Sequence, residues 1–114
     1  MKIRIIRGAH EIGGSCVEVS AKNTKILIDL GLPLYGDEGT IPSDMGSVDA
    51  VLISHPHQDH YGLIEKISYE IPVYLGDLSQ KLIQASRLFT KKKLLQNSFA
   101  NFKKNRPFDI GDFK

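Results

Sequence analysis

The sequence predicts a single α/β domain, and three observations lead to this prediction. The first 31 residues contain three segments with strand patterns, separated by short turns. After them, a buried strand followed by a helix is expected twice, within 48–67 and 72–89. The length of 114 residues suits one modest core, because domains of about 60 to 150 residues bury roughly 60 to 70% of their unfolded surface.

Three strands are expected to open the chain as an antiparallel meander. The segment 2–7, KIRIIR, alternates apolar and charged residues, and 15–20, SCVEVS, alternates again after a glycine-bounded turn. The segment 25–31, KILIDLG, is more continuously apolar, which indicates a more fully buried strand. Residues 32–47 have no period and are rich in Gly, Pro, Asp and Ser, so we expect a long loop of the kind that is often functional.

Two units of strand and helix are expected after this loop. A buried strand, VDAVLIS at 48–54, precedes a short helix at about 62–67, and the strand PVYLG at 72–76 leads into a longer helix. Asp77 is expected to cap the longer helix, which ends near Thr90 or a few residues later. The stretch PFDIGDFK is expected to form a turn leading into a strand. The predicted apolar face of the longer helix consists of Leu78, Leu82, Ile83, Ala85, Leu88 and Phe89.

The composition is typical of a soluble cytoplasmic protein that makes no membrane contact. No run approaches the roughly 18 apolar residues that span a bilayer, and the amino-terminal residues alternate rather than form the apolar core of a signal peptide. The single cysteine, Cys16, has no partner for an intramolecular disulfide and lies in an apolar strand. We therefore expect it to be a small buried side chain rather than a nucleophile.

Charge is distributed unevenly along the chain. Residues 1–80 carry 6 Lys and Arg against 11 Asp and Glu, whereas residues 81–114 carry 9 against 2. A basic flank beside a catalytic region is the electrostatic pattern expected for binding to nucleic acid. Taken alone, the run KKK at 91–93 is more typical of the solvated face of a helix.

The stretch SHPHQDHYG at the end of the fourth strand holds three of the four histidines in the chain. They form the pattern H-x-H-x-D-H, made by His55, His57, Asp59 and His60. Alternate residues of an extended segment face the same way, so His55 and His57 can point to one place, while a turn redirects the other two to a neighbouring one. Two adjacent metal positions follow from this placement. Imidazoles with one carboxylate suit zinc, and iron and manganese also accept this ligand set.

Other interpretations of the pattern fit less well. A solvated histidine-rich turn would leave His57 and His60 without partners and would not explain the buried strand that leads into them. A closed structural zinc site usually relies on cysteine ligands, and Cys16 lies far upstream. The spacing also differs from the helical H-E-x-x-H pattern, so the site is expected on a loop.

With this motif the sequence resembles the metallo-β-lactamase superfamily, whose signature is H-x-H-x-D-H after a buried strand. The segments EIGGSCVEV at 11–19 and ILIDLGLPL at 26–34 are similar to the opening strands of its ribonuclease J and beta-CASP-like branch, nucleases that process RNA or DNA. The resemblance covers residues 1–80 with specific motifs and 81–114 by pattern only. It implies an α/β fold that is the amino-terminal half of a metallo-β-lactamase αββα sandwich.

The resemblance also implies roles for individual residues. His55 and His57 would hold a first metal ion, and Asp59 and His60 a second, most simply both zinc. Asp59 would also accept or return a proton as a catalytic residue. Asp29, at the end of an early strand, would brace the metal-binding loop by accepting backbone hydrogen bonds.

The residues outside the motif leave this expected site incomplete. His10, in the glycine-bounded turn, is expected near the substrate rim. The superfamily completes its two-metal site with two further histidines and a bridging aspartate downstream of the motif, but no histidine follows His60 in this sequence. The resemblance therefore implies that 1–114 is a partial domain, truncated before the downstream ligands, with little or no activity without its carboxy-terminal half.

Three functions remain open from the sequence. The first is phosphodiester hydrolysis of RNA or DNA by a water that two metal ions activate, which the segment 11–19 and the basic final third favour. The second is hydrolysis of a small molecule by an esterase, thioesterase or lactamase of the same superfamily. The third is a non-catalytic fragment, which only the missing ligands support.

Overall fold

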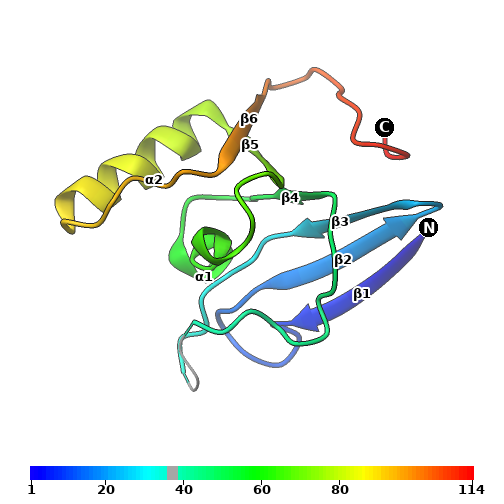
Figure 1. Cartoon of the computed structure of the whole chain (residues 1–114), viewed down its shortest axis with the longest axis horizontal. Coiled ribbons are helices and arrows are strands. Elements are labelled where there is room, and N and C mark those ends of the chain that lie inside the picture. The colour runs from blue at the N-terminus through cyan, green and yellow to red at the C-terminus, as the bar shows by residue number, and fades with distance from the viewer. Residues whose placement is uncertain (36–38) are drawn as a thin grey trace.

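The computed structural model describes residues 1–35 and 39–114, which form one six-stranded sheet with helices packed on one of its faces (Figure 1). The predicted loop at 32–47 connects the third and fourth strands, and its residues 36–38 lie outside the described residues. The strands are β1 (Lys2–Arg7), β2 (Cys16–Ala21), β3 (Thr24–Ile28), β4 (Ala50–Leu52), β5 (Pro72–Gly76) and β6 (Ser98–Phe102). The helices are α1 (Gln58–Tyr61), the 3-10 helix η1 (Ile64–Lys66) and α2 (Asp77–Phe89).

The strands lie in the sheet in chain order, from β1 at one edge to β6 at the other. The pairs β1–β2 and β2–β3 are antiparallel, so the predicted meander is confirmed. The pairs β3–β4, β4–β5 and β5–β6 are parallel. Ile28 is level with Leu52 in the register of β3 and β4, so the carboxyl ends of these two strands lie side by side. The chain segments that leave those ends are therefore brought together.

The apolar core lies between the sheet and the helices. Side chains alternate along each strand, so that Leu27 and Val51 face the helices while Ile26 and Ala50 face the opposite side. The opposite side carries a smaller apolar cluster that packs against Ile110 and other residues near the end of the chain. The largest fully buried side chains, on the helix side, include Leu27, Leu30, Ile53, Leu63, Ile64, Leu75 and Ile83.

The first helix differs from the prediction. A short helix was expected at about 62–67, but α1 is a single turn that starts at Gln58, inside the histidine motif. The amide of Gly62 closes this turn by donating to the Gln58 carbonyl over 2.8 Å. Only η1 lies in the expected range. Asp59 and His60 are therefore held by helical backbone rather than by an open loop.

The second helix begins and ends close to the predicted residues, but its apolar face was predicted wrongly. Gly76 takes the capping position, and Asp77 instead forms an ion pair with Lys81 one turn later, at 2.8 Å. Ile83 is buried, whereas four of the predicted core side chains are at least half exposed. The inward side of α2 also carries Gln84, whose amide group exchanges two hydrogen bonds with the backbone of the returning chain at Leu95. The exposed apolar side chains are Leu78, Leu82, Leu88 and Phe89.

The last quarter of the chain also differs from the sequence prediction. The strand β6 was not predicted, and it forms by pairing with β5 along its full length. The predicted strand in PFDIGDFK is instead a tight turn closed by a bridge between Ile110 and Phe113. Asp112 in this turn accepts hydrogen bonds from the Asn23 amide and the Thr24 hydroxyl, at the start of β3. No helix among the described residues has the length and apolarity to cross a membrane.

Lys91 ends α2 in a left-handed conformation, with φ of 56°. The Lys92 amide donates to the Arg87 carbonyl over 2.8 Å, which completes the helix-ending turn. A side chain in this region costs about 1–2 kcal/mol, so glycine is the usual residue at this position. We expect Lys91→Gly to raise the free energy of unfolding by up to about 1 kcal/mol in chemical denaturation.

Lys92→Gly is the matched control, because Lys92 has no positive φ and glycine there adds only unfolded-state entropy. This variant should be no more stable than the original chain. A Lys91→Gly protein that is equally destabilised would contradict the assignment of strain to Lys91.

Candidate metal centre

Backbone hydrogen bonds from earlier parts of the chain fix the helix that carries the motif. Three consecutive residues of α1 each accept, at the backbone carbonyl, a hydrogen bond from a backbone amide. Each donating residue precedes its acceptor by 25 residues or more in the sequence. The carbonyls of Asp59 and His60 lie at the end of this one-turn helix, where helical partners are missing, and these bonds supply them, while the Gln58 carbonyl accepts from both Leu32 and Gly62. The bonds run from Leu32 to Gln58 at 2.8 Å, from Ser15 to Asp59 at 3.0 Å and from Leu30 to His60 at 2.9 Å.

Gly31 lies at the centre of this contact. A Cβ atom built on Gly31 would lie 1.6 Å from the Asp59 carbonyl oxygen and 2.9 Å from the Ser15 nitrogen. Backbone atoms occupy both positions, so a side chain at Gly31 requires the helix or the segment after β3 to move. Because Gly31 has no side chain, the backbone of α1 can pack directly against the segment after β3.

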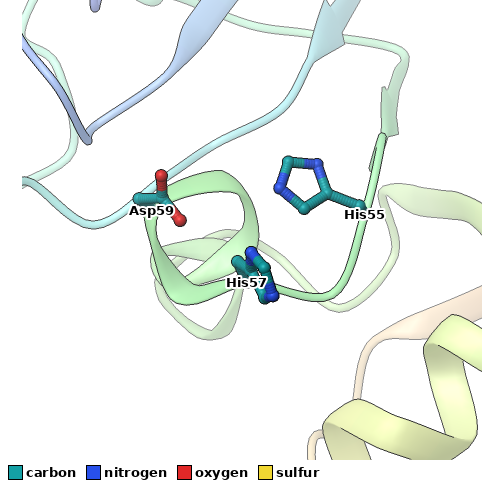
Figure 2. Close-up of side chains that lie close together, drawn as sticks. All are labelled: His55, His57 and Asp59. Atoms are coloured by element: carbon teal, nitrogen blue, oxygen red, sulfur yellow. The ribbon is translucent and has the colours of Figure 1, made fainter.

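The structure brings three of the predicted ligands together at the start of α1 (Figure 2). His55 comes from the chain that leaves β4, and His57 and Asp59 come from the helix start. Each side chain offers one atom that could bind a metal, an imidazole nitrogen or a carboxylate oxygen, and these three atoms lie within 4.8 Å of one another. The rings of His55 and His57 meet edge to face, with centroids 4.9 Å apart. This set of two imidazoles and a carboxylate is suited to a divalent transition metal.

The fourth predicted ligand, His60, lies against the same group. Its ring centroid is 3.8 Å from that of His55, and its Nε2 lies 3.2 Å from a carboxylate oxygen of Asp59. Its other nitrogen, Nδ1, lies 2.7 Å from Oδ2 of Asp29. An ionised carboxylate is an acceptor only, so the proton of this hydrogen bond belongs to Nδ1 of His60. In a neutral ring, Nε2 then presents a lone pair toward Asp59.

Asp29 connects the ends of two strands to the helix. Its carboxylate accepts hydrogen bonds from the Ser54 amide at 2.7 Å and the Ser54 hydroxyl at 2.8 Å, besides the one from His60. Its own amide donates to the Leu52 carbonyl at the end of β4. The side chain is 6% exposed, and the backbone is left-handed with φ of 63°. Asp29 thus has the contacts that a brace of the metal-binding loop requires.

The remaining candidates lie apart from this group. His10 is exposed in the bend after β1. Among the described residues, it is not part of the cluster of His55, His57 and Asp59. Cys16 is buried on the core side of the sheet, and burial raises the pKa of its thiol to about 11, which agrees with a side chain that is not a nucleophile.

Sequence reasoning missed two residues of the site. Ser54 was part of the quoted motif, yet its hydroxyl contacts Asp29 and lies 3.0 Å from Nδ1 of His55. Gly31 was taken as part of a strand. The only sequence signal for either was its position at the carboxyl end of a strand, where ligand sites form in layered α/β proteins.

The comparisons with known proteins agree with this geometry. The family model described as the Metallo-beta-lactamase superfamily matches residues 11–76, which is more than half of the chain and includes the whole histidine motif. The chain belongs to the metallo-β-lactamase superfamily. A solved structure of this superfamily, the metallo-beta-lactamase fold protein YhfI from Bacillus subtilis, has a TM-score of 0.58 and 20% identity, and covers 96% of this chain and 49% of that one. The likeness confirms the predicted fold class.

Curated relatives place the chain in the ribonuclease J and beta-CASP-like branch of the superfamily. The protein named Probable RNase MJ4 of Methanocaldococcus jannaschii is 40% identical over 87 residues, which cover 70% of this chain and 20% of the relative. Ribonuclease J of Helicobacter pylori is 27% identical over an alignment that covers 99% of this chain and 18% of the relative. The chain thus spans about a fifth of the length of these curated relatives.

The close contact at Gly31 gives a direct test of how α1 is positioned. We expect Gly31→Ala to lower the free energy of unfolding by about 1–3 kcal/mol, because the new methyl group overlaps the Asp59 carbonyl. Gly76→Ala is the control, since a Cβ there meets only the Ser79 hydroxyl, at 3.8 Å. Denaturant unfolding measures both. Equal stabilities of the two variants would contradict the packing described here.

Proposed function

We propose that the protein acts as a metal-dependent hydrolase of phosphodiester bonds in RNA or DNA. The observation that carries the proposal is the convergence of donor atoms from His55, His57 and Asp59 within 4.8 Å of one another. His60 lies 3.2 Å from Asp59 and extends this group to four side chains. Membership in the metallo-β-lactamase superfamily implies a divalent metal at this place.

The side chains fit such a metal by their chemistry. His55 and His57 would hold one ion, and Asp59 and His60 a neighbouring one. Nε2 of His60 lies 3.2 Å from a carboxylate oxygen of Asp59, and a cation bound by both atoms would satisfy this contact. Zinc is the simplest choice for imidazole and carboxylate ligands, with manganese or iron as alternatives. Zinc and a cytoplasmic location both stay predictions.

Residues of the chain prepare this site for a cation. The carboxylate of Asp29 holds the proton of His60 on Nδ1, which leaves Nε2 free to coordinate. Ser54 links the same carboxylate to the His55 ring, so two of the imidazoles share one anchor. These contacts limit ring rotation, which lowers the entropy lost when the ligands are ordered around an ion.

The reaction itself follows from the placement of Asp59. A divalent cation held by these residues would supply a water molecule of lowered pKa and would neutralise charge on a phosphate group. Asp59 is half-buried and its carboxylate points into the group of imidazoles, where it can accept a proton from an attacking water and return it to the leaving oxygen. Asp29 holds the His60 ring in place during these transfers.

Two observations favour nucleic acid as the substrate. Two of the curated relatives, those from Methanocaldococcus jannaschii and Helicobacter pylori described above, carry names of ribonucleases. The last 34 residues of this chain carry 9 basic against 2 acidic residues. Phosphate groups attract such a segment. The same cluster of ligands also suits an esterase, thioesterase or lactamase acting on a small molecule. A non-catalytic fragment would need neither metal nor a basic surface.

The test compares cleavage of a labelled single-stranded RNA with hydrolysis of a small ester by the full-length natural protein. We expect His57→Ala to reduce bound metal, measured by elemental analysis, and to reduce RNA cleavage by more than about 100-fold, since loss of a ligand exceeds the 10- to 100-fold cost of losing a partner outside the ligands. His10→Ala is the matched control and should keep its metal. Ester hydrolysis without RNA cleavage would favour the small-molecule alternative, and full metal content in His57→Ala would overturn the proposal.

Asp29→Asn provides a second test of the centre. The amide nitrogen of asparagine would donate to Nδ1 of His60, which would move the ring proton to Nε2 and block coordination there. We expect metal affinity to fall by about 10- to 100-fold in a zinc titration. Asp49→Asn is the control, because Asp49 also accepts a backbone hydrogen bond, from Lys25, but lies at the other end of the sheet. Equal zinc affinities of both variants would exclude this role for Asp29.

A further inference from the structure

A groove runs beside α1 and along the end of α2. It consists of two adjoining clefts of about 230 and 440 Å³, which share Glu65, Arg87 and Lys92 in their walls. Lys66 lines the first cleft, and Lys93 lines the second. Only together do the two clefts reach the middle of the roughly 300–1,000 Å³ range of ligand sites.

The lysines at this groove are held by the turn that ends α2. The sequence indicated a solvated helix face for KKK, but the helix ends at Phe89, and Lys91 reverses the chain through its left-handed backbone. The Arg87 side chain donates from Nε to the Lys93 carbonyl, and the Lys92 amide donates to the Arg87 carbonyl. The backbone of Lys92 and Lys93 is thus held at the groove. The three lysines are solvent-exposed as expected, but they lie on the turn after α2 rather than on a helix face.

The groove has an excess of positive charge. The Arg87 side chain is 12% exposed and pairs with Glu65 at 2.9 Å. Among the described residues, Glu65 is the one carboxylate that lines either cleft, and this ion pair neutralises it. Lys92 and Lys93 are exposed, and within residues 1–35 and 39–114 neither forms an ion pair. Two charges without a carboxylate partner therefore remain for an anionic ligand.

The groove also adjoins the candidate metal centre. Gln58 and Gly62 line its first cleft, and these residues flank Asp59 and His60 in α1. One side of the helix therefore carries predicted metal ligands while the residues around them border the basic groove. The same short helix α1 therefore carries predicted ligands and residues of the groove wall.

We propose that this groove binds the phosphate backbone of a single-stranded nucleic acid, with Lys92 and Lys93 as the main phosphate contacts. The inference rests on the proposed function, because it names where the substrate strand of that reaction lies. Basic grooves that track a backbone are a common means of binding single strands without sequence preference. An acidic protein segment is the competing ligand that the experiment must separate.

The experiment measures binding of the chain to a labelled 12-nucleotide oligouridylate by fluorescence anisotropy, in the presence of a chelator and at several salt concentrations. Lys92→Ala/Lys93→Ala is compared with Lys103→Ala/Lys104→Ala, a second pair of exposed adjacent lysines that lies after β6. Thermal unfolding establishes that both variants are folded. We expect the first pair to weaken binding at least tenfold and to reduce the salt slope by about 1.4, because each single-strand phosphate contact contributes about 0.7. The second pair should change affinity less than about twofold.

Each other outcome overturns the inference. Equal losses in both double variants would show general attraction by the basic third of the chain, and no loss in the first pair would show that the groove is not used. A polyglutamate peptide of equal charge that binds as tightly as the oligonucleotide would assign the groove to an acidic protein. Because binding is measured without metal, a failure here is distinguishable from a failure of hydrolysis, which is tested by metal content and cleavage.

Discussion

The Asp29 carboxylate is the contact on which the arrangement of the site depends. It lies where β3 and β4 end side by side, and it accepts hydrogen bonds from the backbone that leaves β4 and from the ring of His60. A buried carboxylate is costly unless such donors satisfy it, so the strand ends and the helix are held together at one point. The left-handed backbone at Asp29 adds a local cost that these hydrogen bonds offset.

The candidate centre combines side chains from one short segment with a support built from distant ones. The motif would supply the ligands, whereas amides of Ser15, Leu30 and Leu32 hold the helix by hydrogen bonds to its carbonyls. The close approach at Gly31 makes this support rigid, since no side chain separates the two backbones. Gln58 of the same short helix and Gly62, which caps it, line the groove near Arg87, so catalysis and substrate binding would share one element.

The sequence predicted those features that local pattern determines. The meander, β5, the end of α2 near Thr90 and the convergence of the histidine motif all follow from alternation or spacing within a few residues. The strand β6, SFANF, has no such pattern, and only pairing with β5 makes it extended. The exposure of Phe89 and the role of Gly31 likewise depend on neighbours far along the chain. These features could not be predicted from a local window.

The support behind α1 has a consequence for how the site is assembled as the chain is synthesised. All three amides that fix the helix precede it in the sequence, and the meander that holds them is a local structure. A ribosome releases Ser15 through Leu32 before the histidines emerge, so the scaffold can be ready when they appear. An ion that arrived earlier would meet no ordered ligands, so the proposed metal would bind late in the maturation of this protein.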